Sequence, residues 1–154
     1  MWGVTRQALT LVGESGLWKL VGWVHTRLYR VTYGLIGHWT AGLASLLLTT
    51  TGRRSGEQRT VALTYVLDGD DYVVVASNGG ADRDPAWWLN LQAQPEAVVQ
   101  VGASRIPVVA HAADSEERRR LWPMLTASNP FYSRYELLTA RPIPVVVLQP
   151  RERA

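Results

Sequence analysis

The chain has 154 residues, a formal net charge of +3 at pH 7, three histidines and no cysteine. This length suits one domain with an ordinary core, and the lack of cysteine excludes disulfides, thiolate metal sites and cysteine nucleophiles and fits a cytoplasmic protein. The histidines lack the spacing of metal ligands, and the basic excess is too small to indicate nucleic acid, so we expect neither a metal nor a nucleic-acid partner.

Apolar residues recur at helical spacing over residues 15–36, with basic residues mostly on the other side. We therefore expect an N-terminal helical segment at 1–36 and a second unit at 37–154. The helix would dock on the domain or, alternatively, lie in a lipid headgroup layer as a peripheral membrane contact on the cytoplasmic side. The start of the chain has no signal-peptide pattern, and no run of about 20 apolar residues is long enough to span a bilayer.

Six short strands are predicted from apolar and β-branched runs bounded by turn residues. They cover residues 43–51, 59–67, 72–77, 97–101, 106–112 and 144–148. Asp68, Gly69 and Asp70 predict a tight hairpin turn between the second and third strands. Strands that follow one another without regular helical crossovers favour an α+β fold with an antiparallel barrel over a parallel dinucleotide-binding sheet.

Three helices are predicted after the third strand. The first would be capped by Asp84, begin at Pro85 and end at Pro95. Asp114 and Glu117 predict a capping box at the start of the second, which Pro123 is expected to kink. Asn129 and Pro130 are expected to start a short third helix.

The loop at residues 52–59, called here the arginine loop, follows the first predicted strand. Arg53, Arg54 and Arg59 lie close to Ser55 and two glycines, Gly52 and Gly56. Such residues can bind an anion, and glycine lets backbone N–H groups approach a phosphate. The alternative is a hairpin turn with solvated arginines, because the loop has neither P-loop nor dinucleotide-fingerprint spacing.

Three further features indicate a ligand site. The glycine turn at 78–80 precedes a helix start, where a ligand could come close to the backbone. Trp87 and Trp88 point about 100° apart on a helix, so one could pack in the core while the other lines a pocket. Tyr132 and Tyr135 share a helix face. Ordinary loop and core roles are the alternatives for all of them.

The sequence shows no catalytic triad, paired carboxylates or metal motif. If the protein is an enzyme, its reactive centre is expected to come with a cofactor. The arginine loop and the glycine turn together predict a clamp for a large, planar, phosphorylated cofactor.

Four blocks then carry a resemblance to a known family: TTTGRRSGEQR, YVVVASNGGADRDPAWWLNLQAQP, LWPMLTASNPFYSRY and IPVVVL. From about residue 46 to 150 the chain resembles the deazaflavin-dependent nitroreductase family, split β-barrel oxidoreductases that use coenzyme F420. The resemblance implies an α+β antiparallel split β-barrel of about six strands with flanking helices. It also implies hydride transfer from the reduced deazaflavin to a quinone-like or nitroaromatic acceptor.

The resemblance also implies roles for individual residues. The phosphate and polyglutamate tail of the cofactor would lie on the arginine loop, and the ring would lie beside the glycine turn and the following helix. The implied cofactor-binding residues are Arg53, Arg54, Ser55, Gly56, Arg59, Ala76, Ser77, Asn78, Pro85, Ala86, Trp87 and Asn90. Ser77, Tyr132 and Tyr135 would face the acceptor as the catalytic residues.

Other functions stay open at this point. A split barrel that binds flavin mononucleotide or haem is one alternative, although a mononucleotide needs fewer cations than the arginine loop offers. A non-catalytic F420 carrier would share the same binding residues, and an RNA-binding barrel would need a stripe of exposed aromatic residues that is not obvious here. The physiological acceptor and the oligomeric state are not predicted.

Overall fold

The computed structural model describes residues 39–40 and 43–151. The helix expected at 15–36 and the boundary between 1–36 and 37–154 lie outside these residues. The strands are β1 (Trp39–Thr40), β2 (Leu43–Thr51), β3 (Gln58–Thr64), β4 (Val66–Asp68), β5 (Asp71–Val75), β6 (Glu96–Val101), β7 (Ser104–Ala112) and β8 (Val145–Pro150). The helices are the short 3-10 helix η1 (Asn78–Gly80), α2 (Ala86–Ala93), α3 (Ser115–Ser128) and α4 (Phe131–Glu136).

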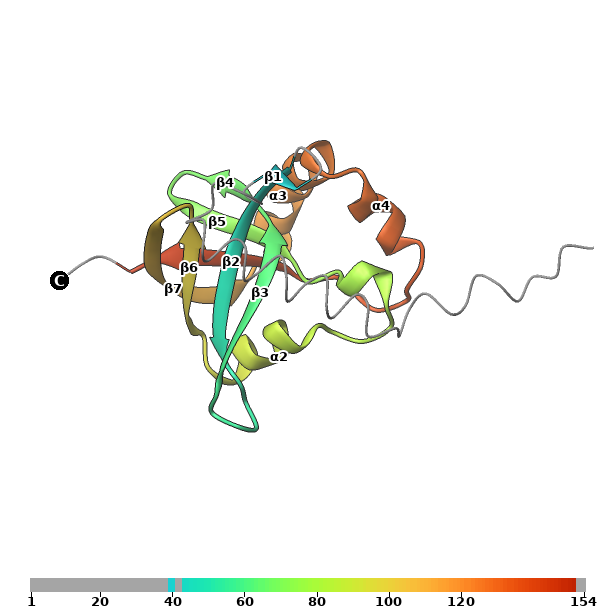
Figure 1. Ribbon diagram of the computed structural model, residues 1–154. Coiled ribbons are helices and arrows are strands. Elements are labelled where there is room, and N and C mark those ends of the chain that lie inside the picture. The colour runs from blue at the N-terminus through green and yellow to red at the C-terminus, as the bar shows by residue number, and fades with distance from the viewer. Residues whose placement is uncertain (1–38, 41–42, 152–154) are drawn as a thin grey trace, which may run out of the picture.

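The strands form one antiparallel sheet that curls on itself (Figure 1). Neighbouring strands follow the order β3, β2, β6, β7, β8, β5, β4, with β1 also paired to β2. Only Tyr65 separates β3, at one end of this order, from β4, at the other. The two ends of the sheet must therefore lie next to each other, which closes the sheet into a barrel. The predicted α+β antiparallel split β-barrel is confirmed.

All six predicted strands are present, with two differences. The strand predicted at 59–67 is two strands, because the chain changes partner at Tyr65: β3 pairs with β2, whereas β4 pairs with β5. The apolar pattern does not show this break, since Tyr65 keeps its side chain against the core. Strand β1 was not predicted, because two residues are too few to show a period.

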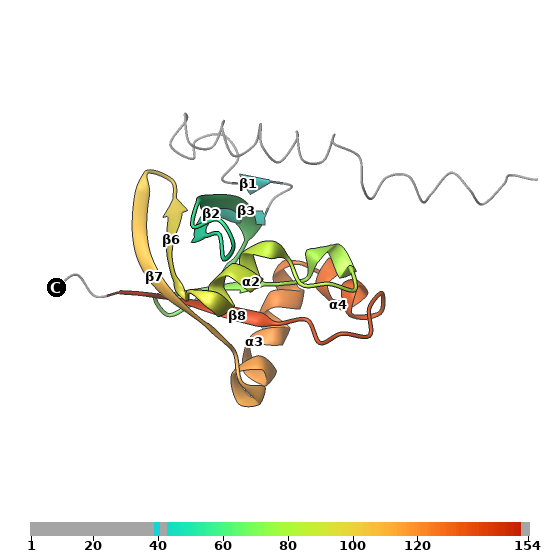
Figure 2. The same cartoon turned by 90° about the horizontal axis from the view of Figure 1, so that it is seen from below.

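Two hydrophobic cores lie on the two faces of the sheet. On β5 and β8, alternate residues such as Val74 and Val146 face the barrel interior, while Val73 and Val147 face α3 and α4. In Figure 2, α3 lies on one side of β8 and the β2–β3 hairpin on the other. Because both faces are buried, these strands are continuous apolar runs rather than alternating ones.

Helix α2 closes one end of the barrel with Trp87, Trp88 and Leu91, all buried in the interior core. The predicted cap of this helix is wrong. Pro85 occupies the N-cap position, and the Asp84 carboxylate instead pairs with Arg141 at 2.8 Å. The capping box of α3 is confirmed. The Asp114 carboxylate accepts from the backbone N–H of Glu117, and the Glu117 carboxylate accepts from the backbone N–H of Asp114. Among the described residues, no helix is long and apolar enough to cross a bilayer.

Candidate functional site

The arginine loop is the turn of the β2–β3 hairpin, and its glycines serve the turn itself. Gly52 N–H donates to the Glu57 carbonyl, and Gly56 N–H donates to the Gly52 carbonyl, both at 2.8 Å. A Cβ at Gly52 would lie 2.8 Å from Ser55 Oγ, while Gly56 has a φ of +71°. The N–H groups of both glycines are therefore occupied within the turn, and neither is open to a phosphate.

A pocket of about 250 Å³ opens between the arginine loop and the start of α2. Figure 1 shows that the turn of the β2–β3 hairpin lies next to α2. Six of the predicted cofactor-binding residues line the pocket together with Gly52. They are Arg53, Arg54, Ser55, Arg59, Ala86 and Asn90. Gly56 and Trp87 do not line this pocket: Gly56 is exposed beside it, and Trp87 is buried in the barrel core.

The three arginines of the pocket differ in their partners. Arg59 pairs with Glu57 at 2.6 Å, and both side chains are more than half exposed. Arg53 directs Nη1 to the Asn90 amide oxygen at 3.4 Å. Arg54 has no hydrogen bond or ion pair within the described part of the chain. Arg54 is thus the guanidinium most available to an incoming anion, and Glu57 is the group that would compete for Arg59.

Asn90 connects the arginine loop to the barrel. Its side chain is 4% exposed, and its oxygen accepts from the backbone N–H of Arg53 at 3.1 Å. Its amide nitrogen donates to the hydroxyl of the buried Thr50 at 3.1 Å. A buried amide with these partners fixes the loop against α2, because breaking either bond would leave a buried polar group unpaired.

The next predicted site residues follow β5. They are Ala76, Ser77 and Asn78, the last of which begins the glycine turn. Ala76 and Ser77 are buried, whereas Asn78 is exposed, has a φ of +47° and donates from Nδ2 to the Arg83 carbonyl at 3.1 Å. No described residue bonds the Ser77 hydroxyl. Gly80 has a φ of +80°, and a Cβ there would lie 3.1 Å from Leu138 and 3.3 Å from the Tyr135 carbonyl. The turn therefore packs directly on α4 and the residues after it.

Both predicted tyrosines are on α4, but their surroundings differ. Tyr132 is 6% exposed, and its hydroxyl is 2.6 Å from the Thr64 hydroxyl at the end of β3. Burial raises the pKa of Tyr132 above its ordinary value, although hydrogen bonds with Thr64 and Asn129 oppose the shift. Tyr135 is half-buried, its ring lies 6.4 Å from that of Tyr132, and no described residue bonds its hydroxyl. Tyr132 is thus a protonated, partnered phenol, and Tyr135 is the unpartnered one.

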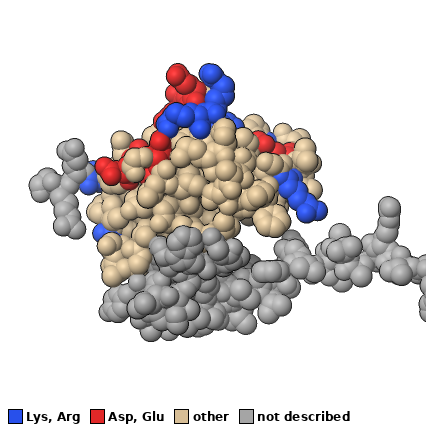
Figure 3. Space-filling model, turned by 90° about the horizontal axis from the view of Figure 1, so that it is seen from above, with Lys and Arg blue, Asp and Glu red and all other residues tan. Residues whose placement is uncertain are grey.

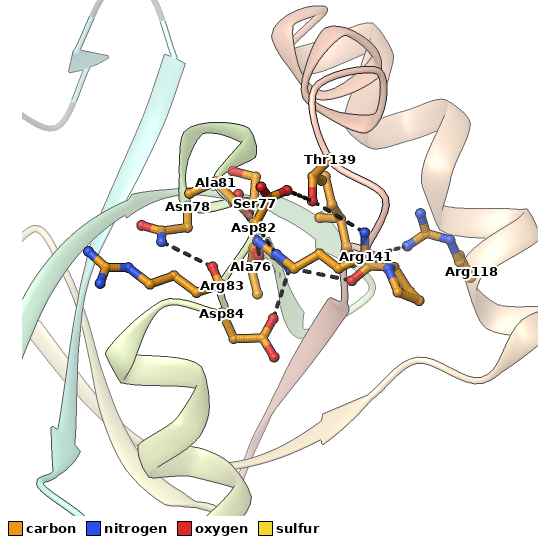
Figure 4. A network of polar contacts seen from close by, with 12 residues as sticks. Ala76, Ser77, Asn78, Ala81, Asp82, Arg83, Asp84, Arg118, Thr139 and Arg141 are labelled. Atoms are coloured by element: carbon orange, nitrogen blue, oxygen red, sulfur yellow. Dashed lines mark hydrogen bonds and ion pairs between the residues drawn. The ribbon is translucent and has the colours of Figure 1, made fainter. Parts of the chain in front are cut away.

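Arg141 is the residue of this region that the sequence did not indicate. It lies between α4 and β8 and bonds the residues on both sides of the glycine turn, Ala76, Ser77 and Ala81, as well as Asp84 before α2, as Figure 4 shows. These partners are 57 to 65 residues away in the sequence. No local pattern could have revealed them.

The charges on the face shown in Figure 3 are mixed. Acidic and basic side chains lie together along one projecting edge, and a broad uncharged area adjoins them. Within the described residues, some basic and acidic side chains form pairs, as Arg120 does with Asp68 at 2.7 Å. The net charge therefore does not locate an anion site, whereas the arginine pocket does.

Comparison with known proteins agrees with this geometry. A family described as F420H(2)-dependent quinone reductase matches residues 23–150. An F420H(2)-dependent quinone reductase of Mycobacterium tuberculosis (strain ATCC 25618 / H37Rv) is 44% identical over 132 residues, covering 83% of this chain and 89% of that protein.

Solved structures give the same picture. An F420-H2 dependent reductase superposes with a TM-score of 0.64 at 37% identity, over 68% of this chain and 93% of the other. A chain described as a domain-swapped dimer superposes with a TM-score of 0.66 at 33% identity, over 82% and 97%. A haem-binding protein of Mycobacterium smegmatis, at 20% identity and a TM-score of 0.54 over 70% and 46%, shares the fold alone.

Proposed function

The chain belongs to the F420H(2)-dependent quinone reductase family, and from this premise we propose that it reduces a quinone with the arginine loop holding the acidic tail of coenzyme F420. As a member of this family it is an F420H2-dependent reductase, and coenzyme F420 is its cofactor. The proposal concerns the residues that do this work and the acceptor. Nitroaromatic compounds would be alternative acceptors.

The arginine pocket is the observation that carries the proposal. Three arginines line this space of about 250 Å³ together with Ala86, the first residue of α2. The tail of the coenzyme carries a phosphate and carboxylates, which arginine grips with paired N–H donors. The residues present therefore fit the tail, with Arg54 as a cation that no described residue pairs and Ser55 as a further donor.

The ring of the coenzyme would lie beside the glycine turn, between Ala76, Ser77 and Asn78 on one side and the start of α2 on the other. When bound there, the reduced coenzyme supplies the hydride. Pro85, Ala86, Trp87 and Asn90 would form or support the wall of this groove. Trp87 would do so from within the core, by holding the first turn of α2 in place.

The chain would contribute hydrogen bonds to the acceptor. The hydroxyls of Ser77 and Tyr135, which no described residue bonds, can donate to an acceptor oxygen as negative charge builds and then help to protonate it. The Tyr132 phenol is protonated at neutral pH, and burial raises its pKa above the ordinary value. Tyr132 can therefore donate as well once its bond with Thr64 rearranges. Loss of one such donor costs on the order of 10²-fold in rate.

Titration with oxidised coenzyme F420 and with flavin mononucleotide, followed by fluorescence, tests the cofactor-binding part of the proposal. We expect binding of the deazaflavin and much weaker binding of the mononucleotide. Oxidation of reduced coenzyme by menadione, a soluble quinone, then distinguishes a reductase from a carrier. Tight binding of flavin mononucleotide alone, or deazaflavin binding without turnover of any quinone, would contradict the proposal.

A further inference from the structure

We propose that Arg141 is a positioning residue, which holds the 76–84 segment in the shape that the cofactor and acceptor site requires. The inference rests on the proposed function for its consequence, but its structural basis is independent of any ligand. Core packing and a backbone hydrogen bond already hold Ala76, whose N–H donates to the Pro144 carbonyl at 2.9 Å. Arg141 adds a constraint on the carbonyl oxygens of Ala76 and Ser77 from a different part of the chain.

The guanidinium of Arg141 distributes its N–H groups over four points of the segment. Nη2 donates to the carbonyl oxygens of Ala76 at 3.1 Å and Ser77 at 2.9 Å. Nε donates to the Ala81 carbonyl at 2.8 Å, which lies beyond the glycine turn. Nη1 donates to the Asp84 carboxylate at 2.8 Å, one residue before the N-cap of α2. The two ends of the segment are thereby held by one planar group.

This arrangement also sets the direction of the backbone. The carbonyl oxygens of Ala76 and Ser77 point to Arg141 and are therefore turned away from the opposite side of the segment. Figure 4 shows the Arg83 guanidinium on that opposite side, far from Arg141. The side proposed to face the coenzyme ring therefore lacks these two carbonyl oxygens, whose partial negative charges would repel electron-rich groups of the ring.

A second contact joins the same two parts of the chain. The Thr139 hydroxyl donates to Asp82 at 2.8 Å and accepts from the backbone N–H of Arg141 at 3.2 Å. Thr139 and Arg141 follow α4, which carries Tyr132 and Tyr135. The segment between α4 and β8 therefore connects the tyrosines proposed to face the acceptor with the turn proposed to hold the ring.

Lysine could not replace Arg141 in this role. An ammonium group has three donors at a single point, whereas the five N–H groups of a guanidinium are spread over a rigid fork. The Arg141 side chain is only 14% exposed, so water could not easily substitute for the missing donors. Arg141→Lys keeps the charge and much of the volume, and it therefore tests the fork itself.

Hydrogen–deuterium exchange of the full-length protein without cofactor tests the structural half of the inference. In Arg141→Lys we expect the amides of 76–84 to exchange about tenfold faster, because loss of one charge-assisted hydrogen bond shifts a local opening equilibrium by about that factor. Arg120→Lys is the matched control, since Arg120 makes a bidentate but exposed pair with Asp68. It should leave exchange of 76–84 unchanged. Unchanged exchange in Arg141→Lys would overturn the inference.

Kinetics with reduced coenzyme and menadione test the functional half. We expect kcat of Arg141→Lys to fall on the order of 10²-fold, the effect of a small misplacement of reacting groups. The Kd for the coenzyme should rise by less than about tenfold, because the tail pocket is separate. Methylguanidinium at millimolar concentration should restore part of kcat in Arg141→Ala but not alter Arg120→Ala. If Arg141→Ala does not fold, Asp84→Asn should show a smaller change in the same direction.

The outcomes separate this inference from the proposed function. If wild-type protein neither binds nor turns over the coenzyme, the proposed function fails while the exchange result still stands. If wild type is active, and Arg141→Lys keeps a kcat within about twofold of Arg120→Lys, the positioning role is overturned. A loss of kcat that merely equals the loss of folded protein, measured by circular dichroism, would overturn it too.

Discussion

Asn90 accepts a hydrogen bond from the backbone N–H of Arg53 at 3.1 Å, across 37 residues of sequence. The acceptor lies on the helix that closes the barrel, and the donor lies on the loop that carries the arginines. The position of the arginine loop is therefore set by a buried amide rather than by the hairpin turn alone. If the turn were not fixed in this way, binding an anion would have to order it, and the free-energy cost of that ordering would lower the affinity.

Replacing Asn90 with leucine should weaken both stability and coenzyme binding. The change leaves the Arg53 N–H and the Thr50 hydroxyl without their partner, which costs about 1–3 kcal/mol of unfolding free energy. Urea unfolding and coenzyme titration would measure the two effects. Gln92→Leu, on the same helix but exposed, is the control and should change neither by much. Equal behaviour of the two variants would show that Asn90 does not fix the loop.

Arg54→Ala should weaken coenzyme binding by about tenfold or more, because it removes a charge-assisted contact to the tail. The loss should shrink as salt rises, since screening weakens the same contact in wild type. Titrations at low and high ionic strength would show this. Arg105→Ala removes an exposed arginine of β7, outside the pocket lining, and should be neutral. If Arg54→Ala and Arg105→Ala bind the coenzyme equally, the tail does not lie on the arginine loop.

Glu57→Gln should have the opposite effect. Glu57 pairs with Arg59 at 2.6 Å, so an acidic tail must compete with this carboxylate and is also repelled by it. Removing the charge frees Arg59, and we expect tighter coenzyme binding by about two- to fivefold, the range of an exposed ion pair. Titration at low salt would detect it. Weaker binding in this variant would mean that Arg59 needs its partner for orientation.

The sequence predicted the elements of this fold well because most of its signals are local. Runs of β-branched residues, the turn at Gly69 and the capping box at Asp114 and Glu117 act over a few residues. The wrong cap predicted for α2 has a different cause. Asp84 has the right side chain for a helix cap, but Arg141, 57 residues away, binds its carboxylate instead.

The candidate site could be predicted only in its charged part for the same reason. Three arginines within seven residues are visible in the sequence, and the structure places all three around one pocket. The roles of the glycines were not visible, because Gly52 is required by the close approach of Ser55 within the turn. Contacts such as Tyr132 with Thr64, 68 residues apart, arise only when the barrel brings α4 to the end of β3.

Gly80→Ala should destabilise the protein more than Gly79→Ala. Both residues have positive φ, of +80° and +64°, so alanine adds about 1 kcal/mol of backbone strain at each. At Gly80 the new methyl also meets Leu138, whereas at Gly79 it meets open space. That overpacking adds about 1–3 kcal/mol, and each kcal/mol lowers Tm by about 2–4 °C in a chain of this size. Equal Tm values for the two variants would show that the turn does not press on the residues after α4.

Tyr132→Phe should change how stability depends on alkaline pH. Burial raises the pKa of Tyr132 above its ordinary value of 10.0, so the folded protein holds the phenol proton more tightly than the unfolded chain does. Between the unfolded and the folded pKa the native state binds more protons, and unfolding free energy therefore falls as pH rises. The contribution is fully present below pH 10.0 and is lost above it.

Urea unfolding of wild type and Tyr132→Phe at about pH 8 and about pH 10.5 would measure this effect. The variant should start less stable by about 1 kcal/mol, because Thr64 loses its partner, and should then lose less stability at the higher pH. Burial and Asp70 raise the pKa of Tyr72 as well, so part of the alkaline loss remains in both proteins. Parallel losses in wild type and variant would mean that the Tyr132 phenol titrates alike in the folded and unfolded chains, and that its burial does not favour the neutral form.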